Sequence, residues 1–191
     1  MFAAAHRATM RLAPSDLTLA EIAAEAGVTA GALAQRFGSK RLLLLSLARA
    51  AATSSGDFIA QLKTMHRSPL AAVRAYAECM AQLAQSPAAL ARNLAYLQID
   101  LADPDFREQL AVQAKATRAG LIDLLGAAVT AGELKRGTDV AALARTVEAM
   151  VNGSLMTWAF YHEGPAERWI RDDVNAVLAP YLATRPSRKH R

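Results

Sequence analysis

Three helix-start signals divide the middle of this 191-residue chain. Each places a side chain that can cap a helix directly before a proline, at Ser68-Pro69, Ser86-Pro87 and Asp103-Pro104. Proline fits the first turn of a helix, where its missing N–H would have no partner, and Ser and Asp satisfy the remaining N–H groups there. The pattern therefore predicts helices over about 69–84, 87–101 and 104–131.

The segments between these signals are rich in residues that form helices. Hydrophobic residues make up 53% of the sequence and aromatic residues only 6%, so Ala and Leu carry most of the apolar content. Both favour helices, and runs of the β-branched residues that favour strands are scarce. The sequence therefore predicts an all-α fold of about nine helices.

The sequence contains no arrangement typical of an enzyme or a metal site. Its single cysteine, Cys79, excludes an intrachain disulfide and favours an intracellular protein. The acidic residues from Asp100 to Asp105 suit helix capping and the positive first turn of a helix. We therefore expect no catalytic residue, no metal ion and no cofactor.

The chain also lacks the features of a membrane or secreted protein. It has no run of about 18 apolar residues that would predict a membrane span. Charged residues interrupt the N-terminal segment, where a signal peptide would have an unbroken apolar stretch. We therefore expect a cytoplasmic protein with no membrane partner.

Charge divides the chain into a basic head and a slightly acidic body. Residues 1–50 carry six basic and three acidic side chains, whereas residues 51–184 carry twelve basic and fourteen acidic ones. A basic region suggests an acidic partner, and nucleic acid is the first candidate. We expect a head over residues 1–48, a body over residues 49–184 and a basic, disordered tail over residues 185–191.

Two short predicted helices near the N-terminus are joined by a tight turn. Ile22 and Ala26 share one face of the first helix, and Leu33 and Phe37 share one face of the second. Gly27 supplies the positive φ that the sharp turn needs. The pair describes a helix-turn-helix, whose second helix lies in the DNA major groove. An ordinary helical hairpin within a bundle is the alternative interpretation.

The N-terminal half of that second helix would meet base edges, and its residues are small. Ala30, Gly31 and Ala32 let the backbone approach the groove closely but offer few hydrogen bonds to bases. We expect readout through apolar contacts to thymine methyl groups, phosphate contacts and DNA shape. Thr18 and Thr29 are placed to cap the two helices.

The segment from Thr18 to Lys40 resembles the DNA-binding segment of TetR-family transcriptional repressors. Eleven positions match that family's pattern in register: Thr18, Ile22, Ala23, Ala26, Gly27, Val28, Thr29, Gly31, Leu33, Phe37 and Lys40. Two positions depart from it, since the family's usual Tyr is Ala34 here and its usual His is Arg36. The resemblance implies an N-terminal three-helix DNA-binding domain followed by a helical ligand-binding and dimerisation domain. The first predicted helix is short for this family, because only about a dozen residues precede Pro14, and whether residues precede Met1 stays open.

The resemblance further implies that the partner of the head is a double-stranded DNA operator. The residues expected to contact it are Thr18, Thr29, Ala30, Gly31, Ala32, Gln35, Arg36 and Lys40. Within this set Thr18, Thr29, Arg36 and Lys40 suit phosphates, and Gln35 adds a contact to a phosphate or a base edge.

For the body, the resemblance implies a small-molecule inducer and a homodimer. Candidate ligand-binding residues are Tyr76, Met80, Leu83, Leu94, Tyr96, Leu97, Phe106, Leu110, Met150 and Trp158. Candidate dimer-interface residues are Val147, Val151, Gly153, Ser154, Leu155, Trp169, Ile170, Val174, Val177, Leu178 and Tyr181. Plain packing within one protomer is the alternative for each residue of both sets.

These features predict a transcriptional regulator, a repressor that a small-molecule ligand releases from a semi-palindromic operator. The alternative is an all-α ligand-binding or enzymatic protein that keeps the helix-turn-helix only as packing.

Overall fold

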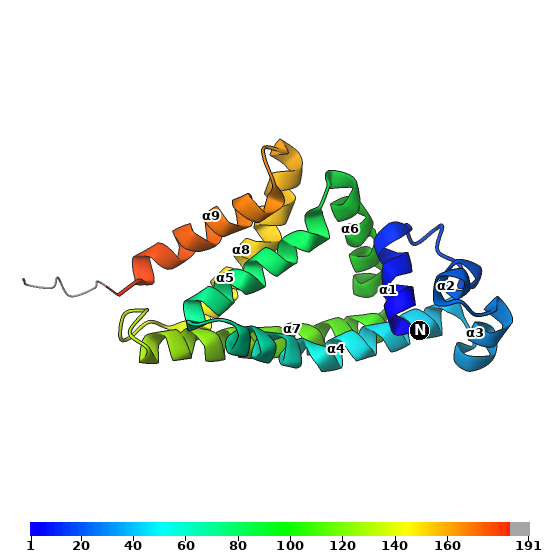
Figure 1. The fold of residues 1–191 in the computed structure, drawn as a ribbon, viewed down its shortest axis with the longest axis horizontal. Helices are drawn as coiled ribbons and strands as arrows, with labels where there is room; N and C mark the ends of the chain where they lie inside the picture. The colour runs from blue at the N-terminus through cyan, green and yellow to red at the C-terminus, as the bar shows by residue number, and fades with distance from the viewer. Residues whose placement is uncertain (184–191) are drawn as a thin grey trace, which may run out of the picture. The chain divides into compact units, whose positions relative to one another are not determined.

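The computed structural model describes residues 1–183 as helices joined by short turns (Figure 1). The α-helices are α1 (Phe2–Arg11), α2 (Leu19–Ala26), α3 (Ala30–Phe37), α4 (Lys40–Met65), α5 (Pro69–Met80), α6 (Pro87–Ala102), α7 (Pro104–Thr130), α8 (Val140–Tyr161) and α9 (Ala166–Leu178). Two 3₁₀-helices, η1 (Ala81–Ala84) and η2 (Ala179–Tyr181), follow α5 and α9. The predicted all-α fold is confirmed. The predicted tail, residues 185–191, lies outside the described residues.

The helices begin where the sequence places its capping residues. Ser68 and Ser86 each accept a hydrogen bond from the backbone N–H three residues on, over 3.1 Å in both cases. Such a cap stabilises a helix by about 1 kcal/mol. The predicted starts at Pro69, Pro87 and Pro104 are confirmed.

Two helices end earlier than the sequence pattern predicts. The α-helical turns of α5 end at Met80 and those of α9 end at Leu178, and a 3₁₀ turn follows each. Pro180 explains the second ending, because it has no N–H and its ring would clash with a helical carbonyl four residues back. The ending of α5 is explained by Pro87. The residue before this proline, Ser86, is extended (φ −156°), so the chain cannot stay helical there, and the last turn after α5 tightens into the 3₁₀-helix η1.

The chain forms two compact units that interleave along the sequence. The first comprises residues 1–56 and 86–116, and the second comprises residues 57–85 and the described residues from 117 onward. Helices α4 and α7 each begin in the first unit and end in the second. The domain limits at residues 48 and 49, which follow the motif and the charge, stay a prediction.

The first unit has its own apolar centre, which we call the head core. Its buried members come from α1 to α4 and the loop before α2: Ala5, Ala8, Leu17, Ile22, Ala23, Leu33 and Leu43. Tyr96 of α6 packs against the head core, and its Oη donates a hydrogen bond to the carbonyl of Leu12, 2.9 Å away. Helix α6, which is distant in the sequence, therefore packs against the head together with the helices α1 to α4.

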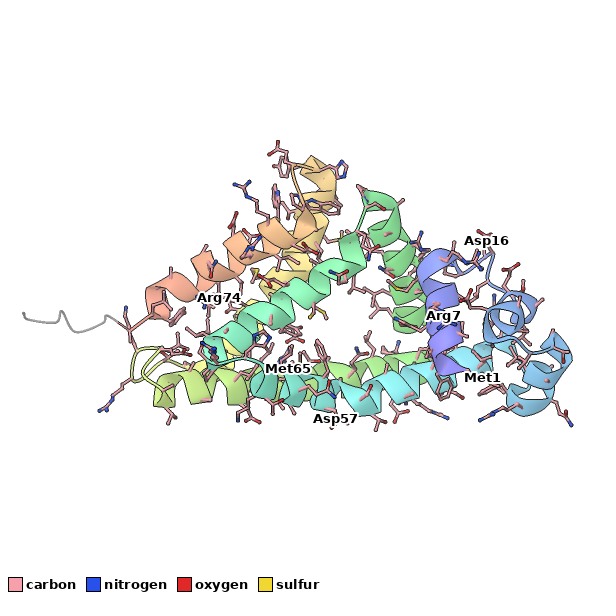
Figure 2. The ribbon with its side chains drawn as sticks, in the orientation of Figure 1. Met1, Arg7, Asp16, Asp57, Met65 and Arg74 are labelled. Atoms are coloured by element: carbon pink, nitrogen blue, oxygen red, sulfur yellow. The ribbon has the colours of Figure 1, made fainter. Side chains whose placement is uncertain are left out.

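In the second unit, α9 packs against both α8 and α5 (Figure 1). The buried apolar residues of α8 and α9 include Val147, Val151, Ile170, Val174 and Leu178. Polar contacts fix the outer edge of α5, where Arg74, labelled in Figure 2, donates from Nε to Asn175 Oδ1 over 2.7 Å. The spacing of three and four residues along both helices explains why these side chains meet.

Helix α4 is the one helix in the described part of the chain that could cross a membrane by length and composition alone. A core helix of a soluble protein meets the same criterion. Five of its apolar side chains are buried: Leu43, Leu45 and Ala52 in the first unit, and Ile59 and Leu62 in the second. The apolar character of α4 therefore has an explanation within the fold.

Candidate DNA-binding site

Helix α3 buries one face and leaves the rest of its surface open. Leu33 is fully buried in the head core. The exposed residues of the helix are Ala30, Gly31, Ala32, Ala34, Gln35 and Arg36. The first half of this surface is small and smooth, and the second half carries an amide and a guanidinium. Such a face can approach a DNA groove with little steric bulk.

The turn before α3 has the geometry that the sequence predicts. Gly27 adopts φ +67°, in the left-handed region where a side chain would be strained. Thr29 caps α3 by accepting a hydrogen bond from Ala32 N over 3.2 Å. Thr18 caps α2 in the same way, accepting from Glu21 N over 3.1 Å. Each cap uses the hydroxyl oxygen as an acceptor and leaves its O–H available as a donor to a phosphate.

Ion pairs inside the head neutralise the basic residues of α1. Arg7, labelled in Figure 2, donates from Nε to Glu25 Oε1 over 2.7 Å, and this hydrogen bond lowers the pKa of the Glu25 carboxyl. Arg11 pairs with Glu21 over 3.4 Å. Arg36, by contrast, forms no ion pair with any residue from 1 to 183 and lies over the ring of Phe37, 5.5 Å from its centroid.

Lys40 has a structural role that the sequence did not predict. Its Nζ donates hydrogen bonds to the carbonyls of Pro14, over 3.1 Å, and Leu17, over 2.8 Å. These bonds tie the start of α4 to the loop between α1 and α2. A lysine ammonium has three donors, so one N–H remains for the predicted phosphate contact.

Arg41 is a basic residue at the head that the predicted set omits. It follows Lys40 directly in the sequence and lies in the first turn of α4. Its guanidinium donates to Asp103 and Asp105, at the start of α7 in the same unit. The sequence shows two adjacent basic residues at a helix start, which could have marked Arg41 as a candidate. It could not show the acidic partners, because they lie 62 and 64 residues away.

The predicted ligand-binding residues divide between the two units. The first holds Leu94, Tyr96, Leu97, Phe106 and Leu110, and the second holds Tyr76, Met80, Leu83, Met150 and Trp158. Some already have packing partners: Tyr96 lies on the head core, and Trp158 donates from Nε1 to the carbonyl of Gly164 over 2.9 Å. Burial raises the pKa of the Tyr76 phenol from 10.0 to about 12. Their part in ligand binding stays a prediction.

A hollow in the second unit has a mixed lining that sequence reasoning did not single out. Its volume is about 470 Å³, and its lining residues are Leu62, Met65, His66, Ala75, Glu78, Cys79, Gln82, Glu167 and Arg171. Burial, with a smaller effect of the Glu78 charge, raises the pKa of the Cys79 thiol, which disfavours the reactive thiolate form. Across residues 1–183, no group of three or more His, Cys, Asp or Glu side chains could hold a metal ion.

The predicted dimer-interface residues fall into an inner and an outer group. Buried within the protomer are Val147, Val151, Ser154, Leu155, Ile170, Val174 and Leu178. Gly153, Trp169, Val177 and Tyr181 are at least partly exposed. Met156 and Phe160 are exposed apolar residues of α8 outside the predicted set, and their spacing from Gly153 places them on one helix face with it.

Comparison with known families identifies both parts of the chain. The model for "Bacterial regulatory proteins, tetR family" matches residues 2–47. The model for "BetI-type transcriptional repressor, C-terminal" matches residues 69–184. No curated protein matches the sequence.

Solved structures share the fold at low sequence identity. A TetR transcription regulator from Haloarcula marismortui is 16% identical with a TM-score of 0.74, and the match covers 95% of each chain. SmeT, the repressor of the Stenotrophomonas maltophilia multidrug efflux pump SmeDEF, is 20% identical with a TM-score of 0.67, over 100% of this chain and 94% of that one. The fatty acid degradation regulator FadR from Bacillus halodurans is 16% identical with a TM-score of 0.68, over 100% of this chain and 95% of that one.

The family matches agree with the helix-turn-helix at the N-terminus and with the helical remainder. The predicted resemblance is confirmed, and the chain belongs to the tetR family of bacterial regulatory proteins, which are DNA-binding regulators of transcription.

Proposed function

We propose that the protein is a cytoplasmic repressor that binds a semi-palindromic operator as a homodimer and leaves it when a small molecule binds the helical body. The outward surface of α3 is the observation that carries this proposal. Its side chains from Ala30 to Ala32 and from Ala34 to Arg36 are exposed, although the helix is anchored by a fully buried leucine. We propose no catalytic step.

The electrostatics of the head support a phosphate contact by Arg36. The arginines of α1 are neutralised by Glu21 and Glu25, whereas Arg36 lies at the end of the recognition helix without an acidic partner among the described residues. A guanidinium can donate two hydrogen bonds to one phosphate. The positive charge of this surface is therefore concentrated where the helix would meet the DNA backbone.

A homodimer is proposed because two copies of α3 are needed to read two half-sites of an operator. Helix α8 leaves Met156 and Phe160 exposed, with exposed fractions of 37% and 75%. Gly153, on the same face, has no atom within 4 Å of the position a Cβ would take, so the backbone there is open to a close approach. This face of α8 is the part of the proposed interface that the protomer leaves uncovered.

The proposal is tested by measuring the affinity of the protein for the DNA around its own gene at several salt concentrations. Arg36→Ala should weaken binding to every sequence and make the salt dependence shallower by roughly one counterion for each lost phosphate contact. Arg49→Ala is the matched control, because Arg49 is an exposed arginine of α4 in the same unit. Lys40 is unsuitable for this test, since its removal also frees the carbonyls of Pro14 and Leu17.

The alternative, in which the helix-turn-helix serves only as packing, makes the opposite prediction. In that case the wild-type protein binds DNA weakly and without sequence preference, and Arg36→Ala and Arg49→Ala behave alike. The ligand-binding part of the proposal is tested separately by thermal-shift screening, where a stabilising compound should also release the protein from its operator.

A further inference from the structure

The side chain of Arg41 lies in a cradle made by two carboxylates at the start of α7. Its Nε donates to Asp103 Oδ2 and its Nη2 to Asp103 Oδ1, both over 2.8 Å. The same Nη2 donates to Asp105 Oδ2 over 2.6 Å. Phe106, which is only 5% exposed, lies beneath the guanidinium, 5.7 Å from ring centroid to Cζ.

The Asp103 carboxylate is held at the start of α7 and is 23% exposed, whereas the Arg41 side chain is more exposed and can rotate. Asp103 precedes the first residue of α7 and accepts a hydrogen bond from Asp105 N over 3.0 Å, and both acids benefit from the positive end of the helix. Arg41 lies in the first turn of α4, the carboxylates are the only hydrogen-bond partners of its guanidinium among the described residues, and 47% of its side chain is exposed. A long arginine side chain can change partner by rotating its own bonds.

The cradle offers Arg41 the same bonds that a phosphate would. Guanidinium forks pair with carboxylates and phosphates in the same two-pronged geometry. Arg41 is also placed for a phosphate: it follows the Gly38-Ser39 segment that links α3 to α4, next to Lys40. A phosphate that reached the start of α4 would therefore compete directly with Asp103 and Asp105.

The charge balance of the cradle opposes DNA binding. Two carboxylates against one guanidinium leave a net charge of −1 at the cradle. Exposed charges act over roughly 8 Å at physiological salt, so a phosphate that reached the start of α4 would meet this negative charge. If Arg41 stays bound to Asp103 and Asp105, it adds no contact to DNA. If Arg41 binds a phosphate instead, the complex with DNA has one more contact and the two carboxylates have no cationic partner.

We propose that Arg41 is a DNA phosphate ligand that Asp103 and Asp105 hold in reserve. In the free protein the guanidinium binds the two carboxylates, and in the DNA complex it binds a backbone phosphate instead. The α6–α7 turn thus lowers the affinity of the head for DNA in general, whatever the base sequence. This inference rests on the proposed function, because it requires that the head binds DNA.

The test compares DNA affinity across a small set of full-length variants. Asp103→Asn with Asp105→Asn should bind DNA about threefold to tenfold more tightly than wild type, with a steeper salt dependence, because Arg41 is released. Asparagine still caps a helix, so α7 should keep its start, and thermal melting checks this. Adding Arg41→Ala to this pair should abolish the gain.

A matched control separates release of Arg41 from simple removal of negative charge. Glu108→Gln removes one exposed acid from the start of the same helix that does not bond to Arg41, whereas Asp105→Asn removes one from the cradle. Only Asp105→Asn should raise the affinity through Arg41. In an otherwise wild-type protein, Arg41→Ala should make the salt dependence shallower by roughly one counterion per protomer, a readout that needs no aspartate variant.

Three results would overturn the inference. They are an unchanged or weaker affinity in the folded double asparagine variant, a gain that persists when Arg41 is alanine, and an unchanged salt dependence in Arg41→Ala. If the wild-type protein binds its operator and a variant gives any of these results, only the reserve role of Arg41 is refuted. Wild-type protein that binds no operator refutes the proposed function and this inference together.

Discussion

Basic side chains near the recognition helix have different partners despite similar positions in the sequence. Arg7 is paired with Glu25, Lys40 holds two backbone carbonyls, and Arg36 is exposed. The motif spacing predicts Arg36 and Lys40 equally well as phosphate ligands. It could not predict the carbonyl bonds of Lys40, because their acceptors lie 26 and 23 residues away and depend on tertiary packing.

Tyr76 carries a prediction about stability at alkaline pH. Burial, with a smaller effect of the Glu148 charge, raises its pKa from 10.0 to about 12. Above its ordinary pKa the unfolded chain loses this proton while the folded chain keeps it, so stability falls as pH rises. The loss should reach about 3 kcal/mol once pH exceeds the folded pKa. Tyr76→Phe should therefore flatten the pH dependence of the free energy of unfolding, measured in urea from about pH 9 to about pH 12.

Tyr96 has to be separated from Tyr76 in this experiment, because burial also raises the pKa of Tyr96 to about 12. Tyr76→Phe should remove only part of the alkaline loss, and Tyr76→Phe with Tyr96→Phe should remove more. A Tyr76→Phe curve parallel to the wild-type curve across this range would contradict the prediction.

The starts of the helices are local features, and the sequence predicted them well. Thr18, Thr29, Ser68 and Ser86 each cap the helix that follows, through a hydrogen bond within three residues. Which face of a helix meets which neighbour is not local. The same apolar spacing on α8 describes residues buried against α9 and residues that remain exposed, so the sequence could not separate an inner face from an outer one.

Helix α7 carries a prediction at the scale of one helix against another. A Cβ on Gly120 would lie 2.6 Å from Cγ2 and 2.9 Å from Cβ of Ile59, within the second unit. Gly120→Ala should therefore destabilise the protein by about 1–3 kcal/mol, because α4 and α7 would have to move apart. The free energy of unfolding in urea measures this cost.

A second glycine on α7 provides the matched control. Gly126 has no atom within 4 Å of the corresponding Cβ position, so Gly126→Ala should be neutral or stabilise the helix by up to about 1 kcal/mol. Ile59→Ala should lower the additional cost of Gly120→Ala, since it removes the nearest atom. Equal stability of the two glycine variants would show that the close approach of α4 and α7 does not exist in solution.

At the scale of the whole molecule, the two units and the two family matches divide the chain differently. The family matches separate residues 2–47 from residues 69–184, whereas the compact first unit also includes α6 and the first half of α7. Two contacts explain the difference: Tyr96 bonds to Leu12, and Arg41 bonds to Asp103. A ligand-induced change in α6 or α7 would therefore reach the head through side-chain contacts that the sequence pattern does not predict.

The proposed dimer carries the prediction that belongs to the assembled molecule. Phe160→Asp places a charge at an α8 position that is 75% exposed in the protomer, so the fold of one chain should tolerate it. If α8 packs against a partner, that charge would be buried without a counterion, and the dimer dissociation constant should rise at least about tenfold. Sedimentation velocity over a range of concentrations measures this constant. DNA with two half-sites should be bound less tightly, whereas a single half-site should be bound as before.

Met65→Asp is the control for this change, because Met65 is an apolar residue of α4 with the same exposed fraction, 75%. It alters surface charge and hydrophobicity by a similar amount but lies outside the α8 face. The prediction requires Phe160→Asp to shift the dimer equilibrium and Met65→Asp to leave it unchanged. Two folded variants that sediment like the wild type would exclude this face of α8 from the interface. If both variants shift the dimer equilibrium, the cause would be a general loss of apolar surface. A specific interface at α8 would affect only Phe160→Asp, because the two positions are equally exposed.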